Sequence, residues 1–445
     1  MYDQYISWID LLLVPLYFIV LYGIMVYIKR RNPDNILIQK YLLKGFVFKV
    51  FCALFYGLLI YYYYGYGDSL SYFRDALFYK QLIANGNESL NFFFVGYNYT
   101  HTTYDMIAGG SEGGFLVEKI SLVFSYFCFS RYLVVTLIFA AVAYAGMFKM
   151  LETFAEIMPQ WHRRLAIIVL FFPSVNVYGS GVLKDTLCIA SMGWLLYMSN
   201  QVFVKKHFSP KNIIILILSF SIIFVVKIYI LAAFVLPYII YLMMKLVKKI
   251  PNRFFRRVVL PTLLGTLVIV YLGFSDFIDN TLGSYSIENI VETVKEQQQS
   301  YLNAEDAESG SVFDLGPTEP TISGFIKKMP AGVTATLYRP FLWESKKLIM
   351  LFSALESLCI LLFTVYVIKK CGILPFFRVI LNDPFVFLCL SFSLVFAALV
   401  GLSTFNFGTL ARYRIPAIPF YLTGLLAILY NNMLIRKKMP RENIA

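Results

Sequence analysis

The feature that most constrains this chain is a series of apolar segments, each about 20 residues long, that recurs along the whole sequence. As a helix rising about 1.5 Å per residue, a run of that length crosses a hydrocarbon core about 30 Å thick. Backbone polar groups in lipid must be satisfied within the segment, so each run is predicted to be an α-helix. We therefore expect an all-α, polytopic integral membrane bundle.

Composition supports this class. The chain has 445 residues, of which 59% are hydrophobic and only 15% are charged. A soluble domain of this length does not carry so much apolar surface. We expect about eleven transmembrane helices, near residues 8–28, 42–64, 132–150, 163–178, 182–201, 211–226, 229–246, 257–275, 347–368, 384–402 and 412–431.

The positive charge has a topological explanation. The net charge of +13 could suggest a nucleic-acid partner, but the basic residues cluster in every second connection between apolar runs. By the positive-inside rule, these connections face the cytoplasm, which places the N-terminus outside and the C-terminus inside. We expect no nucleic acid. The clusters are Lys29–Lys44, Arg163–Arg164, Lys205–Lys211, Lys245–Arg257, Lys369–Arg378 and Arg436–Arg441.

On this topology, residues 1–445 form a single transmembrane domain with two long outer connections, 65–131 and 276–346. Each connection holds an apolar or amphipathic segment expected at the membrane interface, at 114–130 and 322–341. The first apolar run is read as a retained helix because it lacks a basic leader and a small-residue cleavage site. The six cysteines show no metal-ligand spacing, and we expect neither metal nor cofactor.

Charged residues outside the basic clusters are the candidates for chemistry, because charge at the membrane edge is costly. The first candidate follows the second helix in the segment G-Y-G-D-S, where glycines allow a tight turn. Asp68 there could act as a general base on an acceptor hydroxyl, or could be a solvated helix stop. Arg74 and Asp75 follow closely.

Two further candidates lie in tight outer hairpins. In F-F-P-S-V-N-V-Y-G-S-G-V-L-K-D, Pro173 ends a helix, and Lys184 and Asp185 then stand at the next helix N-terminus, which favours anions. The alternative is a mutually neutralised pair that caps the hairpin. Lys227, next to Tyr229, could hold a phosphate or could snorkel to the interface.

The fourth candidate, Y-R-P-F-L-W-E, re-enters the membrane after the second long connection. Arg339 supplies a fork of donors suited to phosphate, Trp343 a flat surface for a sugar ring, and Glu344 a carboxylate. A tryptophan at this depth can also be only an interfacial anchor.

The fifth candidate, N-F-G-T-L-A-R-Y-R-I-P, starts at Asn406 and opens the last helix. Arg412 and Arg414 lie in an outer segment, where the positive-inside rule disfavours them. Two guanidiniums before a helix N-terminus predict an anion site, and a paired structural arginine is the alternative. Together the five segments predict a cationic outer pocket for a lipid-linked pyrophosphate.

These motifs resemble those of bacterial O-antigen polymerase-like and exopolysaccharide polymerase membrane proteins. The features that carry the resemblance are G-S-G-V-L-K-D, R-P-F-L-W-E after a large outer loop, and N-F-G-T-L-A-R-Y-R-I-P. The resemblance implies a GT-C-like glycosyltransferase in the bacterial inner membrane that joins undecaprenyl-pyrophosphate-linked oligosaccharide repeat units, together with other polysaccharide-assembly proteins. It implies that Arg339, Arg412 and Arg414 hold the pyrophosphate, with help from Lys184 and Lys227. Asp68 would be the catalytic base.

Two other classes of function stay open. A flippase or transporter for a lipid-linked saccharide predicts charges through the bilayer centre, where Lys49 is the clear basic candidate. A structural subunit of an envelope complex would explain the hydrophobicity but not the outer arginines. No internal or inverted repeat supports a transporter.

Overall fold

The computed structural model describes residues 5–97, 111–252, 289–303, 311–316 and 321–438, with scattered positions between 253 and 288. Within these residues the protein is all-α, and β pairing is confined to an isolated bridge between Val312 and Asn406. Eight of the described helices are long and apolar enough to cross a membrane. The protein is therefore a multi-pass helical membrane protein, as predicted.

The eight candidate spans and the predicted eleven differ in three places. Residues 163–178 form two short helices, α7 (His162–Leu170) and α8 (Pro173–Tyr178), because Pro173 lacks the N–H that a continuous helix needs. Residues 211–226 and 229–246 belong to one element, α10 (Pro210–Lys248). The expected helix at 257–275 lies mostly outside the described residues.

The chain divides into two compact units, residues 1–227 and residues 228–445. The division falls within α10, whose backbone leaves helical geometry at Lys227 with φ −153° and ψ 81°. Each unit thus takes one helical half of α10. The units are described in turn.

Unit 1 is built around α6 (Tyr132–Ile157), which packs against both α2 and α9. Gly146 and Gly193 let the α6 and α9 backbones touch, since a Cβ on Gly146 would lie 2.0 Å from the Ala190 carbonyl oxygen. The other elements are α1 (Asp10–Arg31), α2 (Ile36–Leu58), η1 (Leu59–Tyr64), α3 (Asp68–Ala84), η2 (Leu90–Phe93), α5 (Glu112–Phe127), η3 (Pro159–Trp161), α7, α8, α9 (Lys184–Ser199), η4 (Asn200–Val204) and the first half of α10.

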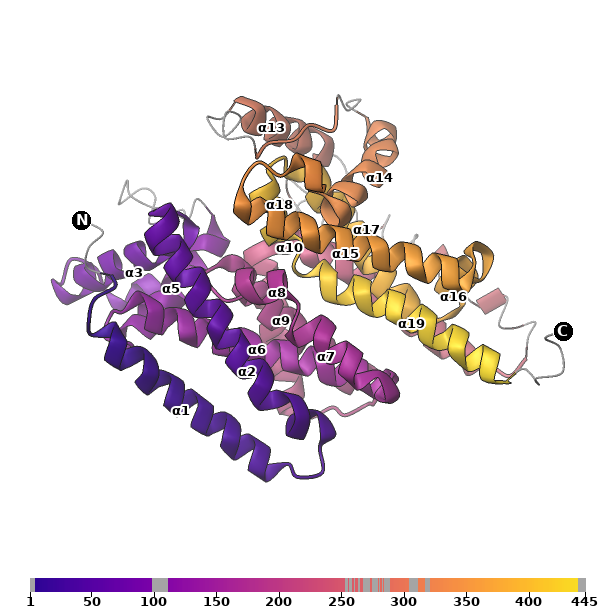
Figure 1. The fold of residues 1–445 in the computed structure, drawn as a ribbon, viewed down its shortest axis with the longest axis horizontal. Helices are drawn as coiled ribbons and strands as arrows, with labels where there is room; N and C mark the ends of the chain where they lie inside the picture. Colours follow the sequence, from indigo (N-terminus) through magenta and orange to yellow (C-terminus); the bar gives the residue numbers. More distant parts are fainter. Residues whose placement is uncertain are drawn as a thin grey trace. The chain divides into compact units, whose positions relative to one another are not determined.

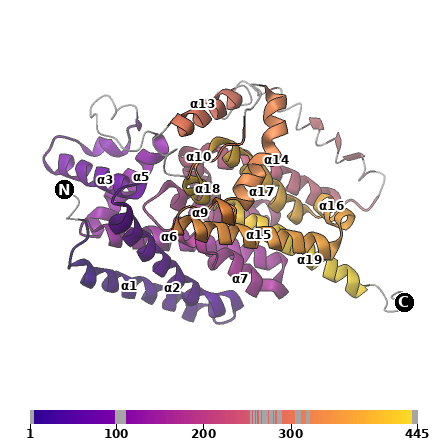
Figure 2. The same ribbon diagram turned by 45° about the horizontal axis from the view of Figure 1, so that its top comes forward.

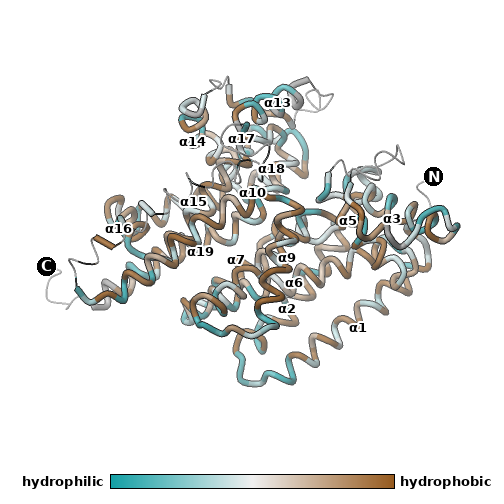
Figure 3. The backbone as a smooth tube through the Cα atoms, turned by 180° about the vertical axis from the view of Figure 1, so that it is seen from behind, coloured by the Kyte–Doolittle hydropathy of each residue, from teal (hydrophilic) through white to brown (hydrophobic). Residues whose placement is uncertain are grey.

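The outermost span of unit 1 is α1, which runs beside α2 (Figure 1). Its apolar side chains are exposed, Leu11 by 81% and Ile19 by 65%, as expected of a helix that faces lipid. Figure 3 shows hydrophobic residues along α2, α6 and α9, with hydrophilic residues gathered in the turn between α1 and α2. This distribution fits membrane crossing.

Unit 2 is built around α17 (Pro384–Ser403), which packs against α14 and α19 (Figure 2). Here too glycines bring two backbones together, because a Cβ on Gly401 would lie 2.0 Å from the Gly332 carbonyl oxygen. The other elements are the second half of α10, α13 (Ile290–Asn303), α14 (Ile322–Tyr338), η7 (Leu342–Glu344), α15 (Leu348–Cys371), α16 (Ile373–Asn382), α18 (Phe407–Tyr413) and α19 (Ala417–Lys438).

The two long connections carry helices of their own. Within 65–131, α3 and α5 pack against each other, and within 276–346, α14 packs along α17. Residues 114–130 and 322–341, expected at the interface, thus lie largely in α5 and α14. Both helices contribute polar groups or backbone to the sites described next.

Candidate functional site

Asp185 and Lys227, which the sequence placed in separate hairpins, form a buried ion pair in unit 1. The Lys227 ammonium lies 2.5 Å from Asp185 Oδ1, and the two residues are 7% and 1% exposed. The non-helical backbone at Lys227 lets its side chain meet the first turn of α9. Gly113 of α5 closes this corner, since a Cβ there would lie 2.7 Å from the Val226 carbonyl oxygen.

Lys184 is the first residue of α9 and is half-buried. Its Nζ lies 3.4 Å from Ser111 Oγ and 5.9 Å from the centre of the Tyr72 ring. Among the described residues, no carboxylate lies within salt-bridge distance of it. The N-cap residue, Leu183, provides no side-chain hydrogen bond, so the ammonium stands beside uncapped amides at a helix N-terminus. Both features favour an anion.

The first turn of α3 is tied to the hairpin that precedes Lys184. Ser69 Oγ accepts a hydrogen bond from the Val182 N–H at 3.1 Å and lies 2.8 Å from the Tyr132 hydroxyl. Gly65 and Gly67 have φ values of 70° and 133°, which provide the turn that starts α3 at Asp68. The predicted base is therefore exposed at the start of a helix anchored beside α9.

The hairpin is held from the other side by Lys49, which is fully buried in α2. Its Nζ donates hydrogen bonds to the Gly179 carbonyl at 2.6 Å and the Asn176 carbonyl at 3.3 Å. A Cβ on Gly181 would lie 2.3 Å from Tyr56 Cε1, so this close approach requires glycine. The sequence indicated Lys49 as the clear basic candidate inside the membrane, and in the structure it binds carbonyl groups at the end of α8.

A second group of charges in unit 1 joins α3 and α5. Arg74 Nε lies 3.0 Å from Asp75 Oδ1, and Asp75 is 3% exposed. Glu118 of α5 is completely buried. Burial, and then the charge of Asp75, raise the pKa of Glu118 to about 8, against smaller opposing effects of Lys184 and Arg74. Sequence reasoning placed no function on Glu118; its signal was a carboxyl group within the apolar stretch 114–130.

In unit 2, Arg414 is a fully buried cross-link. Its Nη2 lies 3.0 Å from a Glu356 carboxylate oxygen, and its Nη1 lies 2.7 Å from Ser357 Oγ. Nη1 also donates to the carbonyl groups of Arg339 at 3.2 Å and Thr336 at 3.4 Å. The guanidinium thereby connects α14, α15 and the turn before α19.

Arg339 follows α14 and is also engaged within unit 2. Its Nε lies 3.0 and 3.1 Å from the two carboxylate oxygens of Glu344, and its Nη2 contacts the same group. The guanidinium lies over the Phe313 and Phe407 rings, 4.8 and 5.2 Å from their centres. The Arg339 guanidinium, which was predicted to bind phosphate, is thus paired with the carboxylate of Glu344, five residues later.

Arg412 is half-buried at the end of α18, with its Nη2 3.5 Å from the Tyr413 hydroxyl. Trp343 is 81% exposed and stacks on Phe341 with ring centres 4.8 Å apart. These two predicted residues present polar and flat surface that a substrate can reach.

Asn406 and Tyr229 make contacts within the fold. Asn406 caps α18, its Oδ1 accepting hydrogen bonds from the amides of Gly408 at 2.8 Å and Thr409 at 3.3 Å. Tyr229 is 8% exposed and stacks on Phe396 with ring centres 5.8 Å apart.

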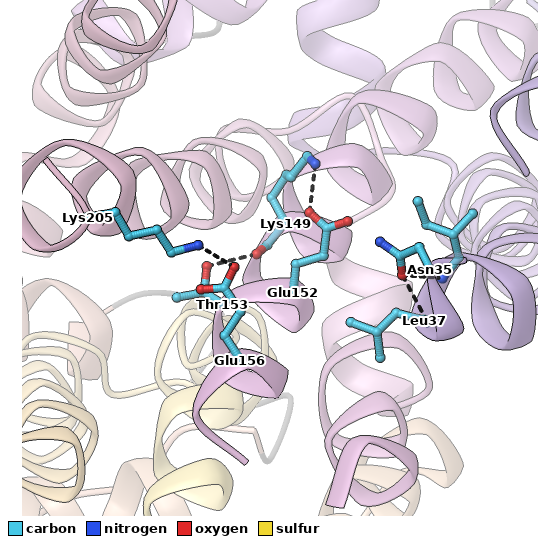
Figure 4. A network of polar contacts seen from close by, with 8 residues as sticks. Asn35, Leu37, Lys149, Glu152, Thr153, Glu156 and Lys205 are labelled. Atoms are coloured by element: carbon cyan, nitrogen blue, oxygen red, sulfur yellow. Dashed lines mark hydrogen bonds and ion pairs between the residues drawn. The ribbon is translucent and has the colours of Figure 1, made fainter. Parts of the chain in front are cut away.

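A polar network lies at the C-terminal end of α6 (Figure 4). Glu152 pairs with Lys149 at 2.6 Å, and Glu156 pairs with Lys205 at 2.7 Å. Asn35 caps α2 nearby, and a cavity of about 540 Å³ is lined by the turn between α1 and α2, the C-terminal end of α6 and Tyr197 of α9. Each of the two carboxylates has an ion-pair partner, so we interpret the network as structural.

The structure thus gathers the predicted residues into two groups, which lie in separate units. Unit 1 brings the Asp68 turn, Lys184, Asp185 and Lys227 together. Unit 2 brings Arg339, Glu344, Arg414 and the Asn406 segment together.

The described residues hold no cluster of three or more histidine, cysteine, aspartate or glutamate side chains that could bind a metal. Comparisons of the chain with protein-family models, with curated proteins and with solved structures find no match.

Proposed function

We propose that the protein is a bacterial inner-membrane glycosyltransferase that joins undecaprenyl-pyrophosphate-linked oligosaccharide repeat units at the extracytoplasmic face, during surface polysaccharide synthesis. The polymerase-like motifs favour this substrate class. The single observation that carries the proposal is Lys184: a half-buried cation without a carboxylate partner among the described residues, at an uncapped helix N-terminus. The hairpin that leads into this helix is bonded to Ser69, the residue after Asp68.

The chemistry follows from these groups. An acceptor hydroxyl attacks the anomeric carbon of the donor sugar, and the bond from that carbon to the pyrophosphate oxygen breaks. Lys184 and the α9 amides stabilise the negative charge that gathers on the leaving pyrophosphate. Asp68, exposed at the start of α3, takes the hydroxyl proton.

We propose the predicted topology for the same protein: about eleven spans, an outer N-terminus, an inner C-terminus and a GT-C-like arrangement. The 39 residues of α10 would extend about 58 Å as one straight helix, roughly twice the hydrocarbon core. Its break at Lys227 therefore supports two separate crossings.

The test replaces Lys184 by alanine in cells that make the polymer, with Lys346→Ala, an exposed lysine, as the matched control. We expect Lys184→Ala to shorten the surface polymer and to accumulate single repeat units outside, while the control keeps normal lengths. Normal polymer with Lys184→Ala at wild-type protein levels would contradict the proposal.

The same experiment distinguishes the alternatives. Precursor that accumulates inside the cell would favour a flippase, and an unchanged polymer with a disrupted envelope complex would favour a structural subunit. Lys49 gives the flippase no support, because its ammonium is bound to backbone carbonyls.

A further inference from the structure

Glu118 stands in apolar surroundings between α3 and α5. On its own helix, Phe115 and Leu122 flank it one turn away on either side, and both pack in a cluster with Ala76 and Tyr79 of α3. Glu118 is 0% exposed, and neither carboxyl oxygen has a hydrogen-bond partner among the described residues. An ionised carboxylate without hydrogen bonds at such a place is strongly disfavoured, and the neutral acid is the stable form.

The charged groups around Glu118 come from two neighbouring helices. Asp75 and Arg74 of α3 and Lys184 of α9 act on it electrostatically. The charged residues of α6, which also packs on α5, lie toward its C-terminal end, from Lys149 onward. Asp185, which follows Lys184 in α9, is paired with Lys227. Arg74 is likewise paired with Asp75.

We propose that Glu118 is a positioning residue, held as a neutral carboxylic acid so that Lys184 stays available for a pyrophosphate group, and that loss of its proton closes this anion site. The inference rests on the proposed function for the identity of the ligand. It assigns Glu118 no contact with substrate.

The mechanism is electrostatic. With Glu118 neutral, the side chains of Arg74, Asp75, Lys184, Asp185 and Lys227 comprise three basic and two acidic groups, a formal net charge of +1. An ionised Glu118 would cancel this excess and attract the Lys184 ammonium, which competes directly with an anionic ligand. The raised pKa of Glu118, about 8, places this change just above neutral pH.

The protonation state is tested first, on the purified full chain in detergent. Infrared spectroscopy reads the C=O stretch of a protonated carboxylic acid directly. We expect a band at pH 7 that disappears as the pH rises and that is missing from Glu118→Gln. Absence of a Glu118 band at pH 7 would overturn the inference, whatever the enzyme does.

Ligand binding is tested second, with inorganic pyrophosphate as the probe. The fraction of wild-type protein that can bind pyrophosphate falls as Glu118 ionises. We therefore expect pyrophosphate binding about tenfold weaker at pH 9 than at pH 7. Glu118→Gln stays neutral and should lack this loss. A pH dependence common to both proteins belongs to pyrophosphate itself, and identical profiles in the two proteins would refute the inference.

A failure of the inference about Glu118 can be distinguished from a failure of the proposed function. Lys184→Ala should abolish pyrophosphate binding at every pH, and its polymer phenotype tests the proposed function separately. If neither wild type nor Glu118→Gln binds pyrophosphate at pH 7, the inferred anion site is wrong even where the polymer phenotype of Lys184→Ala stands.

Discussion

Two predicted cations, one from each unit, have opposite environments. In unit 2, Arg414 is fully buried and bound to Glu356, Ser357 and two carbonyl groups. In unit 1, Lys184 is half-buried, and within the part of the chain that the structure describes its ammonium contacts a hydroxyl at 3.4 Å and a more distant aromatic ring. Both were predicted to hold an anion, from the same kind of sequence signal. The structure favours Lys184, because a ligand can bind only a cation whose donors the fold leaves open.

The strongest test of this difference between Arg414 and Lys184 is the substitution Arg414→Ala. The change removes the donor groups that Arg414 provides to the Glu356 carboxylate and to the Arg339 and Thr336 carbonyls. Removing one partner of a buried ion pair typically costs about 3–5 kcal/mol, and we expect a loss of that size. Thermal unfolding in detergent measures it, with Arg412→Ala, on a half-buried residue nearby, as the control. Equal melting temperatures for Arg414→Ala and wild type would show that Arg414 is not structural, and would restore it as a ligand-binding candidate.

The second prediction concerns Glu118, whose folded-state pKa is raised from 4.5 to about 8, chiefly by burial. Between these values the folded protein keeps a proton that the unfolded chain releases, so stability falls as pH rises, at most by about 1.4 kcal/mol per pH unit. Glu118→Gln carries no such proton. We expect its melting temperature to fall less than that of wild type between pH 5 and pH 8, where both are compared in the same detergent. Parallel melting curves across this range would show that Glu118 titrates normally.

The third prediction separates helix packing, which the units share, from the polar groups, in which they differ. Gly146→Ala in unit 1 and Gly401→Ala in unit 2 each place a Cβ about 2.0 Å from a facing carbonyl oxygen. We expect each to cost about 1–3 kcal/mol, because the helices must move apart. Gly23→Ala in α1 is the matched control, since nothing lies within 4 Å of its added Cβ. A loss in one unit alone would mean that the two cores are not built alike.

Hydropathy predicted the membrane class and most spans because each span is a local property of about 20 residues. It failed at Pro173, which divides 163–178 into α7 and α8. It did separate 211–226 from 229–246 at Lys227, where the backbone of α10 leaves helical geometry. The pairing of Lys227 with Asp185 shows a further limit, since the residues lie 42 positions apart. Sequence identified both as unusual charges. Their contact depends on tertiary packing, which no local pattern records.

The roles within the site were harder to predict for the same reason. Arg339 and Glu344 are close in sequence, and their association could be anticipated. That Arg414 would be enclosed by α14 and α15 could not, because its partners lie 57 to 78 residues away. Glu118 was visible as a carboxyl group in an apolar stretch, but its burial depends on how α5 packs on α3.

The smallest expected effect on stability is also the most informative. Lys184→Ala removes an ammonium that makes no ion pair among the described residues, so we expect the free energy of unfolding to change by less than about 0.5 kcal/mol. Pyrophosphate binding should nevertheless be lost. Arg414→Ala should show the converse, a large loss of stability. If Lys184→Ala also unfolded the protein, Lys184 would belong with Arg414 as a structural cation, and the distinction between these two residues would fail.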